Sequence, residues 1–236
     1  MGNAIGEFFE LSHCLPQGSR PSLDLFFQMI GVMTQLFLRA AEFMLDFFSL
    51  SNFLLGGFVC LVPDLFWRQE PGVELYDRNP EDAKKAFDLY YDFDYDLGVR
   101  DMQDIEVHLK TLPECNGKVG AVGYCLGGKL CYLMCCRTDI DCAVAYYGTY
   151  IEHRIREAKN LHRPFMLHMA MKDRWVQAEV NDLLERRLAP NPLVTIHKYP
   201  GADHAFARHG GKTYSKPEAD RALALSIDFF RTHLGR

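Results

Sequence analysis

Short apolar runs alternate with longer amphipathic segments over the last three quarters of the chain. Three of these runs are apolar or β-branched and predict strands, at residues 118–123, 164–169 and 194–199. Residues 80–97 and 100–111 predict two helices with Gly98 between them, and Pro80 followed by acidic residues is typical of a helix start. Together these elements predict an α/β fold built on a single sheet with flanking helices.

The first 60 residues depart from this pattern in their composition. They hold ten of the 17 phenylalanines but only seven of the 57 charged residues. Residues 47–63 carry no charge, yet a transmembrane helix needs about 20 consecutive apolar residues, and Arg39, Glu42 and Asp46 interrupt the longer apolar region. Residues 34–48 instead predict an amphipathic helix with one broad apolar face against a sheet, so no membrane span is expected.

Other interpretations of residues 1–60 stay open. The segment has neither a basic n-region nor a clean small-residue cleavage site, which argues against a signal peptide. Its composition is compatible with a membrane-active or partner-binding N-terminus. A frame error in the coding sequence would also produce an amino-acid sequence rich in Phe, Leu, Ser and Cys.

Length and charge fit a single domain covering residues 1–236. This length is ordinary for one α/β sheet with flanking helices. The net charge of −5 and the sequence pI near 6.0 give no basic footprint for nucleic acid or for an anionic membrane surface. Neither a linker-like stretch nor an internal repeat divides the chain, and we expect a monomer.

Eight cysteines are scattered along the chain without regular spacing. In the absence of a secretory signal they predict reduced thiols in a cytoplasmic protein. Cys131 and Cys135 are four residues apart and would share one face of a helix, which suits a pair of metal ligands. No C-x-x-C or partnered histidine motif completes such a site, so buried structural cysteines are the preferred interpretation and no metal or other cofactor is expected.

The sequence GYCLG at residues 123–127 has the G-x-S-x-G pattern of a nucleophile elbow, with Cys125 in the serine position. A predicted strand precedes it, and residues 129–136 predict a helix after it. The glycines suit the strained turn and the close packing that such an elbow requires. The turn would project the Cys125 thiol and aim the Leu126 N–H at an oxyanion. A glycine-rich turn that carries a buried cysteine is the alternative.

Two residues downstream of the elbow complete a candidate triad. Asp173 follows the second predicted strand, and His204 follows the third. Nucleophile, acid and histidine thus occur in the α/β-hydrolase order. In this arrangement Asp173 orients His204, and His204 takes the proton from Cys125. The alternatives are that Asp173 caps a helix beginning near Trp175 and that His204 is an ordinary loop histidine.

Four stretches of the sequence resemble the dienelactone hydrolase (carboxymethylenebutenolidase) family. They are PDLFWRQEPG from residue 63, NGKVGAVGYCLGG from residue 116, AVAYYG from residue 143 and GADHAFAR from residue 201. The resemblance covers about residues 58–236. It implies an α/β-hydrolase fold, with a single mostly parallel sheet and helices on both faces. It also implies a Cys-His-Asp triad that opens an enol-lactone to a dicarboxylic acid.

The resemblance also implies roles for the residues of this chain that stand at matching positions in the family motifs. The nucleophile, base and acid that it implies are the three triad candidates, with the Leu126 N–H in the oxyanion hole. Arg208, four residues after His204, matches a family arginine that holds the substrate carboxylate. Tyr147 matches a tyrosine near the family's site. Tyr90 belongs to a segment that roofs the site in the family, although aromatic residues on such a helix are more often core.

The chain departs from the family pattern in two places. The family carries a Q-E-I-F-G-V motif after its third strand, whose glutamate contacts the thiol and whose isoleucine N–H completes the oxyanion hole. The nearest match is QMIGV at residues 28–32, which puts Met29 in place of the glutamate and makes Ile30 the second oxyanion donor. A second family arginine aligns with Ala83, which carries no charge.

These observations predict a hydrolase that opens a small carboxylate-bearing enol-lactone or ester through Cys125 and an acyl-enzyme. Its partner is a small-molecule substrate and not a nucleic acid. A generalist esterase or thioesterase is the alternative from the same fold. A hydrolase-fold binding protein without turnover is the alternative from another class, because Met29 replaces the family glutamate.

Overall fold

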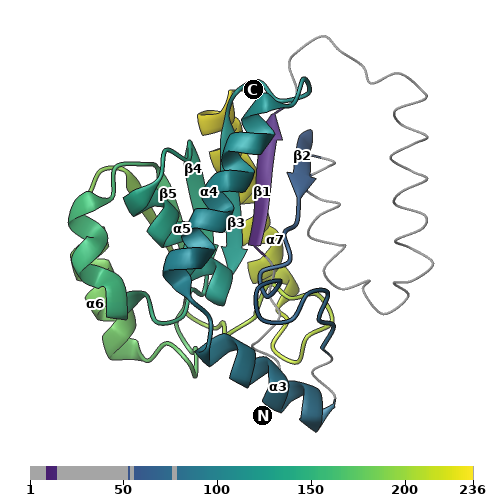
Figure 1. Ribbon diagram of the computed structural model, residues 1–236. Helices are drawn as coiled ribbons and strands as arrows, with labels where there is room; N and C mark the ends of the chain where they lie inside the picture. Colours follow the sequence, from purple (N-terminus) through teal and green to yellow (C-terminus); the bar gives the residue numbers. More distant parts are fainter. Residues whose placement is uncertain (1–8, 15–52, 54–55, 76–78, 236) are drawn as a thin grey trace.

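The computed structural model describes residues 9–14, 53, 56–75 and 79–235 (Figure 1). Its strands form one sheet in the order β2-β1-β3-β4-β5-β6. They are β1 (Phe9–Cys14), β2 (Phe58–Leu61), β3 (Val119–Tyr124), β4 (Cys142–Tyr146), β5 (Phe165–Ala170) and β6 (Val194–Tyr199). Strands β3 to β6 run parallel to one another, whereas β1 is antiparallel to both of its neighbours. The predicted single, mostly parallel sheet is therefore confirmed.

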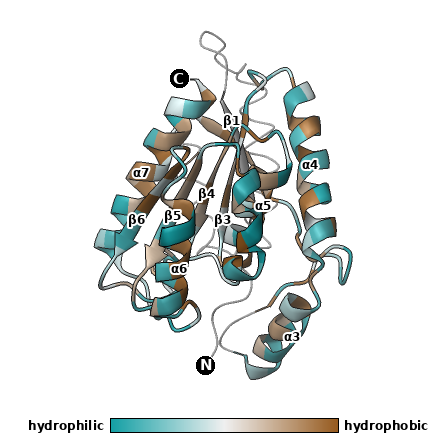
Figure 2. Cartoon of the chain, turned by 90° about the vertical axis from the view of Figure 1, so that its left-hand side faces the viewer, coloured by the Kyte–Doolittle hydropathy of each residue, from teal (hydrophilic) through white to brown (hydrophobic). Residues whose placement is uncertain are grey.

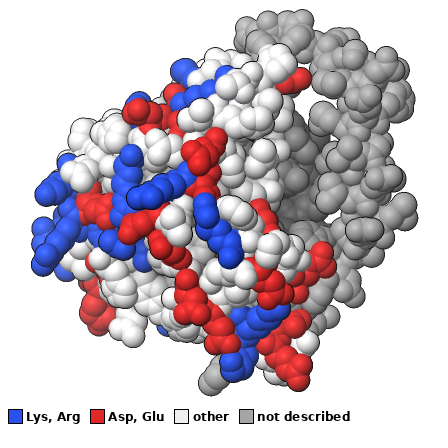
Figure 3. Space-filling view, in the orientation of Figure 1, with Lys and Arg blue, Asp and Glu red and all other residues white. Residues whose placement is uncertain are grey.

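Helices cover both faces of this sheet. They are α3 (Pro80–Tyr91), α4 (Tyr95–Thr111), α5 (Leu126–Arg137), the 3-10 helix η1 (Ile151–Asn160), α6 (Ala178–Leu188) and α7 (Lys216–Leu234). Helix α5 contacts α4 and η1 on one face, and α6 contacts η1, while α7 contacts β3, β4 and β5 from the opposite face (Figures 1 and 2). Positive and negative side chains are interspersed over the face shown in Figure 3.

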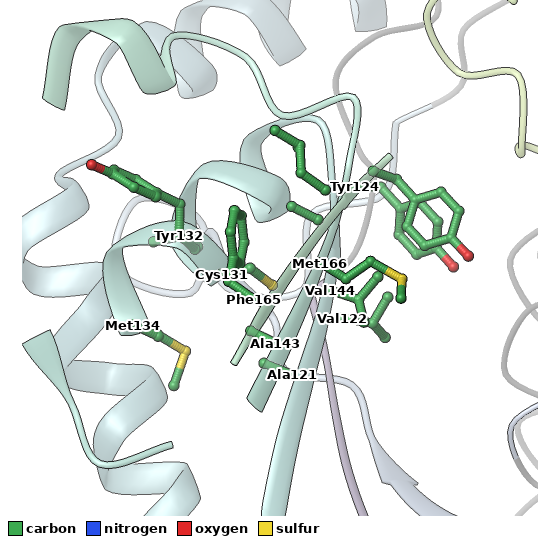
Figure 4. Packing of buried hydrophobic residues seen from close by; sticks show 14 of the residues in the cluster. Ala121, Val122, Tyr124, Cys131, Tyr132, Met134, Ala143, Val144, Phe165 and Met166 are labelled. Atoms are coloured by element: carbon green, nitrogen blue, oxygen red, sulfur yellow. The ribbon is translucent and has the colours of Figure 1, made fainter. Parts of the chain in front are cut away.

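The middle of the sheet is the hydrophobic core. Strands β3, β4 and β5 are buried along their whole length, which explains their nearly continuous apolar sequences. Figure 4 shows buried side chains of α5 and of these strands in one cluster. The rings of Phe53, Phe58 and Phe230 pack edge to face, with centroids 5.7 to 6.5 Å apart. The loops at the strand ends are thus mounted on a rigid scaffold.

The boundary between α3 and α4 differs from the prediction. Asp94 caps the start of α4, because its carboxylate accepts hydrogen bonds from the N–H groups of Asp96 at 2.9 Å and Leu97 at 3.0 Å. Gly98, expected to separate two helices, lies inside α4. A Cβ at this position would lie 2.7 Å from Phe93 Cζ, so the glycine makes room for that ring. The helices predicted at 80–97 and 100–111 were therefore wrong at this boundary.

Part of the atypical N-terminal segment belongs to the sheet. Strand β1 and most of β2 lie within the first 60 residues, and the sequence pattern predicted neither of them. The helix predicted at residues 34–48, and the matched residues Met29 and Ile30, lie outside the described residues. No helix within the described ranges is long and apolar enough to cross a membrane.

Candidate active site

Cys125 occupies a strained turn between β3 and α5. Its backbone angles are φ 52° and ψ −110°, a conformation that residues other than glycine rarely adopt. A Cβ at Gly123 would lie 2.2 Å from the carbonyl oxygen of Gly127, so only glycine fits there. The strand, turn and helix predicted for the elbow are all present, although α5 begins at Leu126 and not at residue 129.

The backbone around the thiol is suited to an oxyanion. Leu126 is the first residue of α5, so its N–H has no acceptor within the helix and lies at the positive end of the helix dipole. The Cys125 N–H donates to the carbonyl of Tyr146 at 3.0 Å, which fixes the turn against β4. Cys125 itself is only 2% exposed. Negative charge that develops next to this residue would therefore be stabilised by the helix end.

Asp173 and His204 form a buried pair between the loops after β5 and β6. His204 Nδ1 lies 2.7 Å from Asp173 Oδ2, and the two side chains are 3% and 1% exposed. The other oxygen, Oδ1, accepts hydrogen bonds from the N–H groups of Trp175 at 2.7 Å and Val176 at 3.1 Å. Asp173 thus holds its own loop and orients the histidine as well. The helix that the alternative interpretation of Asp173 placed near Trp175 begins at Ala178.

The pKa of His204 is raised well above its usual value of 6.5. Burial by itself lowers this pKa, but the negative charge of a Cys125 thiolate and the hydrogen bond to Asp173 raise it by more. Because Asp173 engages Nδ1, Nε2 is the nitrogen that can exchange a proton with Cys125. The structure therefore brings the three triad candidates together and makes the imidazole a ready proton acceptor.

A further side chain at the thiol was not predicted. Thr149 Oγ1 lies 3.8 Å from Cys125 Sγ and 2.5 Å from Tyr90 OH. Thr149 and Tyr90 are 3% and 7% exposed. Tyr90, which was expected to line the site, thus reaches Cys125 through Thr149. The sequence carries no signal for Thr149, because its contact with the thiol depends on how the turn after β4 packs against α5.

The remaining candidate residues lie on the loops after β4 and β6. The ring of Tyr147 lies beside the imidazole of His204, with centroids 4.9 Å apart. Arg208 is half-buried, and its N–H donates to the carbonyl of Ala205 at 3.0 Å. Tyr147 therefore borders the triad candidates, and Arg208 follows His204 on the same loop. Ala83 lies in the first turn of α3.

Cys131 and Cys135 lie in the core and not at this site. Burial raises the pKa of each thiol well above its usual value, and neighbouring thiols raise it further. Figure 4 shows Cys131 among the apolar side chains between α5 and the sheet. In the part of the chain that the structure describes, no group of three or more His, Cys, Asp or Glu is arranged to hold a metal ion. Both thiols therefore pack as small apolar groups.

Comparisons with known proteins identify the family. The model of the dienelactone hydrolase family matches residues 47–234. Carboxymethylenebutenolidase 1 of Cupriavidus pinatubonensis is 36% identical over 173 residues, which cover 73% of this chain and 74% of that protein. The carboxymethylenebutenolidase of Pseudomonas putida is 35% identical over 173 residues, 73% of each chain.

The fold has relatives among solved structures. A protein of Klebsiella pneumoniae subsp. pneumoniae, provisionally assigned as a dienelactone hydrolase, superposes with a TM-score of 0.63 at 21% identity. The superposition covers 73% of this chain and 74% of the other. The α/β-hydrolase fold expected from the sequence is thereby confirmed.

Proposed function

The chain belongs to the dienelactone hydrolase family, and we propose on that basis that it hydrolyses a small carboxylate-bearing enol-lactone or ester through Cys125, His204 and Asp173. The observation that carries this proposal is the buried hydrogen bond of 2.7 Å between His204 and Asp173, beside a cysteine on a strained elbow. The substrate is a small molecule, and water is the only co-reactant.

Cys125 is the nucleophile of the proposed reaction. His204 Nε2 takes the proton from the thiol, and the sulfur bonds to the substrate carbonyl carbon while the carbonyl oxygen becomes an oxyanion. The N–H of Leu126 and, by the sequence match, the N–H of Ile30 donate to that oxygen. The tetrahedral intermediate then collapses, the C–O bond of the ester breaks, and His204 returns the proton to the leaving oxygen.

Water completes the cycle. It loses a proton to His204 and adds to the thioester carbonyl, and cleavage of the C–S bond releases the carboxylic acid and restores Cys125. Asp173 keeps Nδ1 of His204 protonated and stabilises the imidazolium in both steps. When the substrate is a lactone, the leaving oxygen stays on the same molecule. The product is then a single ring-opened acid.

Arg208 is the residue proposed to hold the substrate carboxylate, and Tyr147 and Tyr90 border the bound acyl group. A guanidinium suits this role because it binds a carboxylate with two parallel hydrogen bonds. Ala83 stands at the position of the family's second arginine and supplies no second positive charge. This difference favours a generalist esterase or thioesterase as the second candidate function.

Hydrolysis of an activated aryl ester tests the proposal. Cys125→Ala should lower kcat/KM at least about a thousandfold, while the thermal midpoint stays within a few degrees because only one buried sulfur is lost. Asp173→Asn should lower kcat/KM by about 10⁴, because the amide favours the wrong tautomer of His204. Cys115→Ala, in the loop before β3, is the matched control and should keep the wild-type rate. Wild-type activity in Cys125→Ala or Asp173→Asn would remove that residue from the site.

A further inference from the structure

Gly128 and Gly148 bring the turn after β4 against the elbow helix. A Cβ at Gly128 would lie 2.8 Å from Gly148 Cα, and a Cβ at Gly148 would lie 3.1 Å from the Gly128 carbonyl carbon. At Gly128 the facing backbone is too close for a Cβ, and at Gly148 a Cβ would also meet the Ile151 side chain at 2.8 Å. Tyr147 and Tyr150, in the same turn, have positive φ angles of 38° and 54°. This strained turn fixes Thr149 next to Cys125.

Thr149 contacts Cys125 with both its backbone and its side chain. Its N–H donates to the Cys125 carbonyl at 3.2 Å, and its hydroxyl oxygen lies 3.8 Å from Sγ. The same hydroxyl oxygen lies 2.5 Å from Tyr90 OH. The side chains of Thr149, Cys125 and Tyr90 are all buried, so bulk water competes little for these contacts.

The hydrogen bonds of the two hydroxyl groups can run in one direction, from Tyr90 to Thr149 and from Thr149 to the sulfur of Cys125. A threonine hydroxyl has one proton to donate. If Thr149 donates this proton to sulfur, Tyr90 must be the donor in the other contact. Burial, together with the negative charge of a Cys125 thiolate, raises the pKa of Tyr90 above its usual range. Tyr90 therefore keeps the proton that it offers to Thr149.

We propose that Thr149, oriented by Tyr90, is a positioning residue that donates a hydrogen bond to the Cys125 thiolate. When His204 takes the thiol proton, the sulfur changes from donor to charged acceptor, and the Thr149 hydroxyl turns its proton toward it. The bond stabilises the thiolate and holds Sγ in one rotamer beside the elbow helix. The inference rests on the proposed function only for the identity of the nucleophile.

Several ionisable groups from other elements face Cys125. His204 comes from the loop after β6, with Asp173 behind it on the loop after β5. The tyrosines that face it are Tyr90 of α3, Tyr95 of α4 and Tyr150 of the turn after β4. Thr149→Val changes none of these residues and removes only the hydroxyl, together with its contact to Tyr90 OH. A shift in the titration of the thiol then measures the hydroxyl itself.

Alkylation of Cys125 by iodoacetamide, followed against pH by peptide mass spectrometry, tests the inference without requiring turnover. Thr149→Val removes the hydroxyl but keeps the β-branched shape and the backbone N–H. We expect the pH midpoint of Cys125 alkylation to rise by about one unit, which is a tenfold loss of thiolate below that midpoint. Thr149→Ser keeps the hydroxyl and should have the wild-type midpoint.

Tyr90→Phe removes the orienting donor and should raise the midpoint as well, by less than Thr149→Val. Tyr91→Phe, an exposed neighbour on α3, is the matched control and should leave the midpoint unchanged.

Three outcomes would overturn the inference. The first is a wild-type midpoint in Thr149→Val. The second is a midpoint in Thr149→Ser as high as that of the valine variant, because packing and not the hydroxyl would then cause the shift. The third is a wild-type midpoint in Tyr90→Phe, which decides the question if Thr149→Val does not fold. Ester hydrolysis that survives Cys125→Ala overturns the proposed function instead, so the two failures are distinct.

Discussion

The two carboxylate oxygens of Asp173 have separate partners. Oδ1 accepts from the N–H groups of Trp175 and Val176, and Oδ2 binds Nδ1 of His204. An asparagine can keep its oxygen on the two N–H groups and turn its NH₂ toward the histidine. The loop would then stay in place while the tautomer of His204 reverses. This division explains why Asp173→Asn should lose activity and keep its fold.

At the residue scale, the proposed contact of Arg208 with a substrate carboxylate can be tested directly. A contact between a partly buried guanidinium and a carboxylate contributes roughly 1.5 to 3 kcal/mol, so Arg208→Ala should lower kcat/KM for a carboxylate-bearing ester by about tenfold or more. The matching neutral methyl ester should change little. Steady-state kinetics on this pair of substrates measure the ratio of the two losses.

Arg174→Ala is the control for this experiment. It removes an exposed guanidinium that pairs with Asp203, close in sequence to His204. The ratio of the two rates should stay at its wild-type value in this variant. Equal losses on the acid and on its methyl ester in Arg208→Ala would make Arg208 a structural residue.

The residues at this site differ in how far the sequence reveals them. Cys125, Asp173 and His204 could be proposed because each follows a strand with a clear apolar pattern. Thr149 could not, since its contact with the thiol depends on the close approach of two glycines that are distant in sequence. The burial of Lys129 was not predicted either. This lysine is 4% exposed on α5, with its amine 3.8 Å from the centroid of the Tyr95 ring.

Backbone contact between β3 and α5 holds the elbow at the scale of the elements. Gly123→Ala would place a Cβ 2.2 Å from the Gly127 carbonyl oxygen, and no flexible side chain is there to move away. We expect the free energy of unfolding to fall by about 3 kcal/mol or more, as measured by urea titration. Gly201→Ala is the control, because its Cβ would meet only Glu218 Oε1, at 3.8 Å. Its effect should stay below about 1 kcal/mol, and an equally small effect at Gly123 would contradict the close contact.

Strand positions followed the sequence more closely than helix starts. The strand predicted at 194–199 is β6, and those predicted at 118–123 and 164–169 are β3 and β5 displaced by one residue. Helix starts depend on single caps, such as Asp94 at α4. Helix α5 begins three residues before its predicted start, because the strained Cys125 turn places two glycines in the first helical turn, where propensity alone disfavours them.

Strand β1 connects the atypical N-terminal segment to the rest of the molecule. It lies between β2 and β3 and pairs with both, so the sheet is continuous only through residues 9–14. Its sequence, FELSHC, alternates apolar and polar residues over only four positions, about the shortest run that indicates a strand. Pairing with two distant strands, and not local pattern, therefore determines this element.

The stability of the whole molecule should fall as the pH drops below about 6.5. His168 is fully buried, with Nδ1 2.8 Å from Tyr199 OH and Nε2 3.0 Å from Ser226 Oγ. Burial lowers the pKa of His168 well below 6.5, and the nearby His197 and Arg221 lower it further. Below pH 6.5 the unfolded chain therefore binds a proton that the folded chain excludes. For each such proton, the free energy of unfolding falls by about 1.4 kcal/mol per pH unit. Urea unfolding at pH values between 7 and 5 would measure this fall.

His168→Gln isolates this contribution. The glutamine amide keeps one donor and one acceptor for Tyr199 and Ser226 but cannot titrate. The fall in the free energy of unfolding between pH 6.5 and pH 5 should therefore become smaller by the contribution of about one proton. His204 acts in the opposite sense, because its pKa is raised in the folded protein. Its contribution to stability is therefore complete below pH 6.5 and is lost only as the pH rises through the raised pKa. It cannot produce a loss in acid. The exposed His108→Gln on α4 is the control and should keep the wild-type slope. A wild-type slope in His168→Gln would show that this buried histidine is not the group that couples folding to protons.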